Sequence, residues 1–317
     1  MRRLRTPALF AAVLGLVLLG FAATSGRPAL AVGSQIRTFV ASAGSDANPC
    51  SRVAPCRTFG AALAQTAGGG EIVALDSGGY GAVTINQAVT IVAAPGVHAS
   101  ISPSSGAAII VDAGPTDVVV LRNLYLNAQG GATGVLYLAA AALHVENLVI
   151  NGFANYGISM GLATAADLYV ADTIVRNTGN SGIYLLNSSG IANVSIARTR
   201  LENNYIGIVV ASNARANVKD TIVSGNAAYG FFASSDLTAV QLNLEGCVAS
   251  GNAYGIFSGS TSPTPGGTAV VRVSNCSLTG NGTGVSAGAN GSTLSRGNNT
   301  LEGNSINGTF SAPYAAK

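Results

Sequence analysis

A short motif, a glycine followed by an aliphatic or aromatic residue, recurs through the second half of this 317-residue chain. Successive copies lie 23 to 29 residues apart. The copies are Gly134-Val135, Gly157-Ile158, Gly182-Ile183, Gly207-Ile208, Gly230-Phe231, Gly255-Ile256 and Gly284-Val285. A nearly constant period of this length indicates a chain built from stacked repeats.

Each repeat favours short strands over helices. Two or three runs rich in Val, Ile and Leu alternate apolar and polar residues, and Gly, Asn and Ser separate the runs. The absence of long helical stripes excludes ankyrin, tetratricopeptide and armadillo arrays. A repeat of about 25 residues made of strands and tight turns predicts one coil of a parallel β-solenoid. We expect an all-β, single-domain, single-stranded parallel β-helix of roughly nine coils.

Stacking of coils accounts for the low charge, which is 9% of residues. Equivalent residues of neighbouring coils lie about 4.8 Å apart, so a column of like charges would repel itself. Uncharged Asn, Ser, Thr and Gly tolerate this repetition. We expect one column of asparagines joined side chain to side chain, as in cross-β ladders. Its members would be Asn151, Asn177, Asn203, Asn226, Asn252 and Asn281.

The ends of a solenoid expose unpaired strand edges and therefore call for caps. Residues 57–67 are the best helix candidate, with Phe59, Leu63 and Thr66 at helical spacing. We expect this helix to cap the first coil. The predicted organisation is a signal peptide over residues 1–31, a disulfide loop and capping helix over 32–70, the β-helix over 71–300, and a C-terminal cap or tail over 301–317.

The first 31 residues have the pattern of a secretory signal. Arg2, Arg3 and Arg5 precede an apolar run, and Ala29-Leu30-Ala31 supplies a cleavage site. The run is short for a membrane anchor, so we expect cleavage after Ala31 and a periplasmic, extracellular or cell-surface protein without membrane attachment. Four of the 16 basic residues and none of the 13 acidic ones leave with this segment, which changes the net charge from +3 to −1. This charge argues against nucleic acid as a partner.

Four cysteines in an exported chain suggest two disulfides, with three possible connectivities. Cys50 and Cys56 bound a short proline-containing segment that suits a closed surface loop. Cys247 and Cys276 each lie eight residues before a motif glycine, so they share a column on neighbouring coils. We expect them to form a disulfide rather than remain as two buried thiols. Zinc is the weaker alternative, because neither histidine has ligand spacing to the Cys-x5-Cys pair, and no metal site is predicted.

Residues near the start of the chain carry a resemblance to a known family. The segments are 37–46 (RTFVASAGSD), Asn48-Pro49-Cys50 and Pro55-Cys56-Arg57-Thr58-Phe59, followed by Glu71-Ile72-Val73, Gly79-Tyr80 and Val89-Thr90-Ile91. They resemble the start of secreted right-handed parallel β-helix proteins of the pectin-lyase-like superfamily, and the resemblance covers nearly all of residues 37–300. It implies a right-handed β-helix. It leaves the activity open, because the superfamily holds lyases, hydrolases, epimerases and adhesins.

The catalytic motifs of that superfamily's polygalacturonase-like hydrolases and alginate lyases are missing from this chain. Charged residues lie 9 to 11 positions before several motif glycines, and they predict one charged column: Glu146, Asp172, Arg198, Asp220 and Glu245. Under a lyase interpretation, Asp172, Arg198 and Asp220 would supply carboxylates and an arginine base, with calcium as the cofactor. We favour a surface ion-pair ladder of alternating sign, assign no catalytic residue and expect no cofactor.

Tyr156, Tyr229 and Tyr254 each precede a motif glycine directly and would therefore fall in one column. Packing at the core or at a corner is the favoured interpretation, and a sugar-binding platform is the alternative. A long regular scaffold without a convincing acid/base pair favours a non-catalytic secreted or surface protein. It would bind extracellular polysaccharide or serve as a structural or adhesive rod. The alternative is a polysaccharide lyase, a glycoside hydrolase or another carbohydrate-active enzyme of the superfamily.

Overall fold

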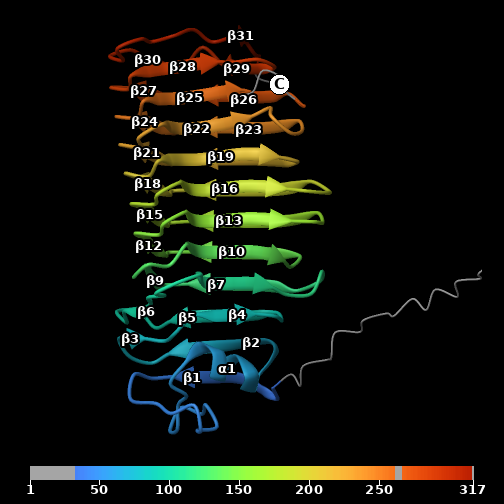
Figure 1. Ribbon diagram of the computed structural model, residues 1–317, viewed down its shortest axis with the longest axis vertical. Coiled ribbons are helices and arrows are strands. Elements are labelled where there is room, and N and C mark those ends of the chain that lie inside the picture. Colours follow the sequence, from blue (N-terminus) through green and yellow to red (C-terminus); the bar gives the residue numbers. More distant parts are fainter. Residues whose placement is uncertain (1–32, 261–265, 316–317) are drawn as a thin grey trace, which may run out of the picture. The chain divides into compact units, whose positions relative to one another are not determined.

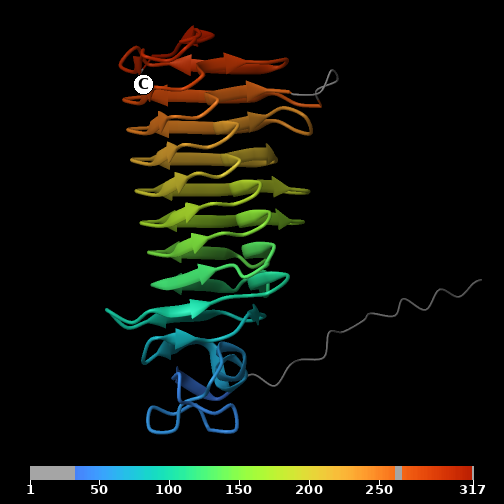
Figure 2. The ribbon, with the colours of Figure 1, turned by 60° about the vertical axis from the view of Figure 1, so that its left-hand side comes forward.

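The computed structural model describes residues 33–260 and 266–315. The predicted signal peptide lies outside the described residues. Within them, the chain winds into stacked coils, and successive coils add strands to three parallel sheets (Figure 1, Figure 2). This arrangement confirms the predicted all-β parallel solenoid of about nine coils. The described residues contain no helix that is long and apolar enough to cross a membrane.

Sheet A contains twelve strands, and its neighbours pair in parallel. They are β1 (Gln35–Val40), β2 (Thr66–Ala74), β5 (Val89–Ala93), β8 (Val118–Arg122), β11 (Ala142–Glu146), β14 (Ala166–Ala171), β17 (Ala192–Ala197), β20 (Ala214–Lys219), β23 (Val240–Glu245), β26 (Ala269–Ser274), β29 (Gly291–Ser295) and β31 (Ala312–Pro313).

Sheet B follows sheet A after a one- or two-residue turn in most coils and contains ten short strands. They are β3 (Gly78–Gly79), β6 (Ala99–Ile101), β9 (Leu124–Asn127), β12 (Val149–Asn151), β15 (Ile174–Arg176), β18 (Arg200–Glu202), β21 (Ile222–Ser224), β24 (Val248–Ser250), β27 (Ser277–Thr279) and β30 (Thr300–Leu301).

Sheet C completes the coil and contains nine strands. They are β4 (Val83–Ile85), β7 (Ala107–Asp112), β10 (Thr133–Ala139), β13 (Tyr156–Leu162), β16 (Ser181–Asn187), β19 (Ile206–Ser212), β22 (Tyr229–Ser234), β25 (Tyr254–Gly259) and β28 (Thr283–Ala287).

The repeated glycine is required by the close approach of neighbouring coils. A Cβ atom on Gly207 would lie only 2.5 Å from the carbonyl oxygen of Gly230, which is the motif glycine of the next coil. The same near-contact recurs from Gly157 to Gly255. The residue after each glycine fills the core: Ile183, Ile208, Phe231 and Ile256 are paired from coil to coil and fully buried. The motif therefore encodes one close contact between coils and one core position per coil.

Two ladders contain five of the six predicted asparagines, so the prediction of a single six-membered column is wrong. One ladder is buried and carries Nδ2-to-Oδ1 hydrogen bonds of 2.8 to 3.2 Å. Its members are Asn204, Asn226, Asn252, Asn281 and Asn304. The other is more exposed and joins Asn127, Asn151 and Asn177. The register explains the error, because Glu202 pairs with Ser224 and this places Asn204, not Asn203, opposite Asn226.

The first coil is capped by helix α1 (Phe59–Gln65), which lies within the predicted range of 57–67 (Figure 1). The hydroxyl of Thr58 caps it by accepting a hydrogen bond from the main-chain N–H of Ala61, at 3.2 Å. Sheet A includes β1 before the helix and β31 after residue 300. The strands therefore extend beyond the predicted limits of 71–300 at both ends.

The four cysteines behave in two different ways. Cys50 and Cys56 form a disulfide with Cα atoms 4.6 Å apart, as the short loop suggested. Cys247 and Cys276 share a column but are free and buried, so the disulfide predicted between them is wrong for this structure. Stacked side chains leave their strands in parallel directions, and each thiol instead lies within hydrogen-bonding distance of a main-chain carbonyl of its own coil: Glu245 for Cys247 and Ser274 for Cys276.

Candidate functional site

The three predicted tyrosines lie at the starts of strands in sheet C. Tyr229 pairs directly with Tyr254 on the next coil. Ser181 and Ile206, which also pair with each other, occupy the intervening coils between Tyr156 and Tyr229. The predicted column is therefore present. Tyr156 lies three coils from Tyr229, which is about 14 Å at the usual strand spacing.

The tyrosines belong to a larger group of rings on the outer side of sheet C, which we name the aromatic face. Its members are Tyr156, Tyr184, Tyr229, Phe232, Tyr254 and Phe257. Phe232, with Ile206, Val209 and Ala211, forms an apolar cluster separate from the core of the β-helix. The core side chain Phe231 is adjacent to Phe232 in sequence. The alternation of side chains along a strand sends these two neighbours to opposite sides of the sheet.

The rings of the aromatic face form two stacks. In one stack, Tyr156 and Tyr184 have centroids 5.0 Å apart and planes inclined by 27°. In the other, Tyr229 stacks on Phe232 at 4.9 Å and on Tyr254 at 5.2 Å. Phe257 meets Phe232 edge-on at 5.5 Å. These separations and inclinations lie in the range that favours aromatic pairs, so each ring holds its neighbours in place.

A hollow of about 180 Å³ lies between the two stacks. Tyr184 and Phe232 belong to its wall, and Val209 lies between them in the same row of the sheet. Polar residues that line it include Asn180, Ser234 and Asp236. The hollow therefore combines apolar ring surfaces with amide, hydroxyl and carboxylate groups.

Two phenols of the aromatic face, those of Tyr184 and Tyr229, are held in the neutral form at ordinary pH. Burial raises the pKa of Tyr184, and burial together with the neighbouring Tyr254 raises the pKa of Tyr229. A neutral phenol can both donate and accept a hydrogen bond. The face can therefore offer flat apolar surface and hydroxyl groups to an uncharged, ring-shaped ligand.

Sequence reasoning missed three of the six rings, namely Tyr184, Phe232 and Phe257. A signal for them exists in the repeat, because each is the second residue after a motif glycine. Side-chain alternation sends that position away from the core whenever the first residue after the glycine points inward. The same position carries Ser159 and Val209 on other coils, so the rings are confined to a few coils.

The charged residues occupy two adjacent columns, so the prediction of one five-membered charged column is wrong. Glu146 and Glu245 are the last residues of β11 and β23. Asp172, Arg198 and Asp220 lie one position later, in the turn between sheets A and B, where each adopts a positive φ of 48° to 53°. The count back to the motif glycine varies by a residue between coils, and this variation merged the two columns.

Asp172 and Arg198 form a surface ion pair. The guanidinium Nε and Nη2 of Arg198 donate to the two carboxylate oxygens of Asp172, each at 2.7 Å. The side chain of Arg198 is 59% exposed and that of Asp172 is 50% exposed. The ion pair lowers the pKa of Asp172, and the Asp172 carboxylate raises the pKa of Arg198. A raised pKa leaves less of Arg198 in the neutral form that a general base requires, and its guanidinium is already paired with Asp172, so both observations favour the ion-pair interpretation over the lyase one.

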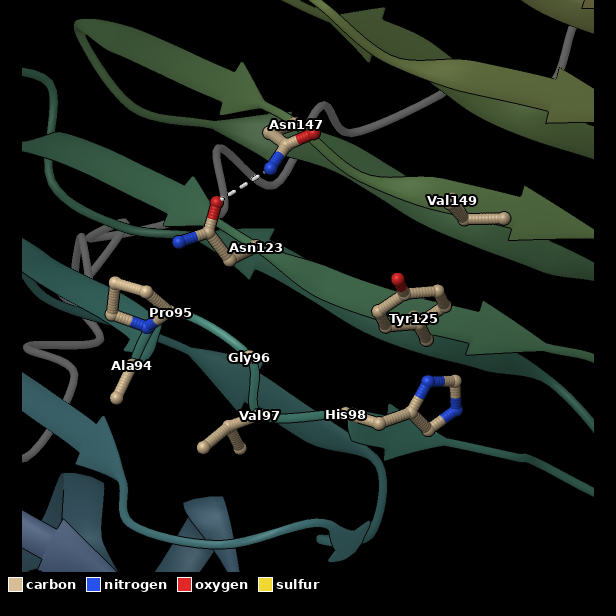
Figure 3. Close-up of a pocket in the computed structure, with 9 residues that line it drawn as sticks. All are labelled: Ala94, Pro95, Gly96, Val97, His98, Asn123, Tyr125, Asn147 and Val149. Carbon is tan, nitrogen blue, oxygen red and sulfur yellow. Dashed lines mark hydrogen bonds between the residues drawn. The ribbon is translucent and has the colours of Figure 1, made fainter.

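A second hollow, of about 370 Å³, lies beside sheet B and contains none of the predicted site residues (Figure 3). The rings of His98 and Tyr125 lie side by side in it, with centroids 3.8 Å apart. Asn147 donates its side-chain amide to Asn123 at 2.8 Å, so these two amides partly satisfy each other. Across residues 33–260 and 266–315, no group of three or more His, Cys, Asp or Glu side chains is arranged to hold a metal ion.

Comparison with known proteins agrees with the fold. The family model described as "Right handed beta helix region" matches residues 133–306. Pectate lyase Pel9A is similar in structure, with 16% identity, a TM-score of 0.65, and coverage of 90% of this chain and 80% of that chain. The A-module of mannuronan C-5 epimerase AlgE4 from Azotobacter vinelandii has 12% identity and a TM-score of 0.51, covering 89% of each chain. Among curated proteins none matches in sequence. At these identities the likeness shows the fold alone.

Proposed function

Since this chain belongs to the right-handed β-helix family and has the pectin-lyase-like fold, we propose that it is an exported protein that binds polysaccharide on its aromatic face without cleaving it. The observation that carries this proposal is the stack of Tyr229 on Tyr254 and Phe232. The rings lie on the outer side of a sheet whose inner side already supplies the core.

The face suits a sugar polymer for a physical reason. Sugar rings carry apolar C–H faces that pack on aromatic rings, and hydroxyl groups that pair with phenols and amides. The two ring stacks are separated along the axis of the coils by the Ile206 position, and they flank a hollow with polar groups at its rim. A linear chain laid along successive coils could contact both stacks at once.

Export is part of the proposal and has two supports. The Cys50–Cys56 disulfide suits an oxidising compartment, because thiols are kept reduced in most cytosols. The N-terminal sequence pattern predicts a cleaved secretory signal. Polysaccharide is abundant outside cells, so an exported protein would meet the ligand that we propose for it.

Binding without cleavage is preferred over lyase activity because of the state of Arg198. Its guanidinium is engaged by Asp172, and this raises its pKa when a base would need a lowered one. The similar structures are named for a pectate lyase and a mannuronan epimerase. Acidic polysaccharides therefore belong in any screen for ligands beside neutral ones.

Affinity electrophoresis in gels containing polygalacturonate, alginate, xylan or a mixed-linkage glucan tests the proposal. We expect retention in at least one gel, and no unsaturated product when the same polymers are incubated with the protein. Replacement of Tyr229 and Tyr254 by alanine should abolish retention by the neutral polymers, xylan and the mixed-linkage glucan. The matched control is Tyr169→Ala, which removes a partly exposed tyrosine stacked on His144 on sheet A.

Two outcomes would overturn this proposal. Unsaturated products that disappear in a variant carrying both Asp172→Asn and Asp220→Asn would establish the lyase alternative. Migration unaffected by every polymer would leave a structural or adhesive role. If products persist in that double variant, Asp172 and Asp220 are not the catalytic groups of the enzyme.

A further inference from the structure

We propose that sheet A carries a second binding site, a cationic groove that holds the carboxylates of an acidic polysaccharide. The groove has a volume of about 520 Å³ and lies near the C-terminal end of the stack. Its functional residues are Lys219, Glu245, Arg272, Arg296 and Tyr314. It lies on a different sheet from the aromatic face and does not depend on ligand binding there.

The register of sheet A brings the charges together. Lys219 pairs with Glu245, and Glu245 pairs with Ser274, so these residues occupy one column on three consecutive coils. Arg296 continues the column on the fourth coil, where its main-chain N–H donates to the carbonyl of Val273 at 3.1 Å. Lys219 and Arg296 are therefore about 14 Å apart along the axis.

Arg272 lies in the neighbouring column, opposite Asn243. Its guanidinium makes only long hydrogen bonds, of 3.4 Å to Asn243 and 3.5 Å to Gln241. In the described part of the chain, no carboxylate lies within ion-pair distance (4 Å) of the side-chain nitrogens of Lys219, Arg272 or Arg296. Three cations thus face the groove with most of their donors free for a ligand.

The one carboxylate in the groove is already engaged. Glu245 accepts a hydrogen bond of 2.5 Å from the side-chain amide of Asn275. Hydrogen bonds from Asn275 and Ser274 lower the pKa of Glu245, with a smaller contribution from Arg296 and Lys219. The groove therefore has a net charge of +2 when all four groups are ionised, in a chain with few charges elsewhere.

Tyr314 fixes one wall of the groove. The guanidinium carbon of Arg296 lies 5.5 Å from the centroid of its ring, a cation–π contact that holds the arginine over the groove. Tyr314 directly follows β31, so this wall exists only because the last strand adds to sheet A. A uronic acid polymer matches the site because it repeats carboxylates on sugar rings. A nucleic acid matches it less well, because the single ring is already covered by Arg296 and cannot stack successive bases.

Fluorescence anisotropy with a labelled oligogalacturonate tests the site, with the methyl-esterified oligomer and a single-stranded DNA as competitors. The acid form should bind, the uncharged ester should compete at least about tenfold more weakly, and added salt should weaken binding. Arg272→Gln and Arg296→Gln should each weaken binding about tenfold or more, the usual size of a lost charge-assisted hydrogen bond. The control Arg176→Gln makes the same charge change on sheet B and should leave binding unchanged.

The proposal is overturned if the acid form does not bind, if the ester competes equally, or if Arg176→Gln weakens binding as much as the groove variants. Competition by DNA as strong as by the oligogalacturonate itself would reassign the groove to phosphate. The double variant Tyr229→Ala with Tyr254→Ala should retain this salt-sensitive binding. Loss of binding in that variant would assign the acidic oligomer to the aromatic face instead.

Discussion

The side-chain oxygen of Asn252 accepts two hydrogen bonds from Asn226 on the preceding coil. One comes from the main-chain N–H at 3.0 Å and the other from the side-chain amide at 2.8 Å. Asn252 in turn donates its own amide to the carbonyl of Val223, at 3.1 Å. Both asparagines are at least 97% buried. The ladder therefore satisfies main-chain groups in the turn between sheets B and C that would otherwise be buried without partners.

Asn252→Ala should lower the free energy of unfolding by about 2–4 kcal/mol, because it leaves two donors of Asn226 and one carbonyl oxygen without these partners. Urea denaturation followed by circular dichroism measures the change. The control is Asn151→Ala in the exposed ladder, where water can replace the lost partners and the cost should stay below about 1 kcal/mol. Equal losses in the two variants would contradict the role assigned to the buried ladder.

The motif glycine is predicted to be intolerant of even one methyl group. Gly207→Ala places a Cβ atom 2.5 Å from the carbonyl oxygen of Gly230, so coils must shift, at a cost of about 2 kcal/mol or more. Gly161 in β13 is the matched control, since a Cβ atom there meets no atom within 4 Å. Thermal unfolding of both variants tests this. A Gly207→Ala protein as stable as Gly161→Ala would show that the repeat has another cause.

Asp172 should titrate below its ordinary pKa because Arg198 pairs with it. A carboxyl with a lowered folded pKa stabilises the protein above its unfolded pKa, near 3.8, and this contribution disappears as the pH falls through the folded value. Arg198→Gln should move the pKa of Asp172 back toward the ordinary value and flatten the acid side of the stability curve. Side-chain NMR titration measures the pKa. An unchanged value would mean that the pair does not form in solution.

Arg198 adopts a φ of 48°, a conformation that favours Asn or Gly. The ion pair it makes is exposed, and such pairs contribute about 0–1 kcal/mol. Arg198→Gly should therefore leave stability within about 1 kcal/mol of the parent, or raise it. A loss well above that in urea denaturation would mean that the ion pair stabilises the turn more than its exposure suggests.

Cys247 and Cys276 should react with an alkylating reagent only after denaturation, because both thiols are buried and unbonded. The same column holds threonine on earlier coils, where the main-chain N–H of Thr199 donates to the hydroxyl of Thr221 at 3.4 Å. The N–H of Cys247 makes the equivalent contact with the sulfur of Cys276, also at 3.4 Å. Cys276→Thr should therefore preserve stability better than Cys276→Ala. Mass spectrometry that finds these two cysteines bonded would contradict the assignment.

The period of the repeat made the fold predictable, because every coil must bring one glycine against the next. The same period could not separate adjacent columns. Asn203 and Asn204 are neighbours in sequence, and both positions favour asparagine for different reasons. The first takes a positive φ of 55°, whereas the second directs its side chain into the buried ladder. Turn length varies by one residue between coils. This variation made the two asparagine columns look like one in the sequence, and it did the same for the two charged columns.

The aromatic face was only partly predictable for a similar reason. The tyrosines before the motif glycines were visible as a column, but a column alone does not show which side of a sheet its rings cover. The contacts of Phe232 show that the rings cover the outer side of sheet C. Phe232 contacts Tyr229 and Phe257 on the side opposite the core residue Phe231. The groove on sheet A was not predictable, since Tyr314 reaches Arg296 only through the pairing of β31 with β29.

Tyrosine fluorescence gives the most direct test of polysaccharide binding on the aromatic face, since the chain has ten tyrosines and no tryptophan. The titrant is a soluble oligosaccharide of whichever polymer retards the protein, added in high salt so that the cationic groove is screened. We predict a saturable change in emission for the parent protein. Replacing both Tyr229 and Tyr254 by alanine should weaken the apparent affinity about tenfold or more, the effect of losing two ring contacts. An affinity unchanged in that variant, or weakened as much by the control Tyr169→Ala, would contradict the account.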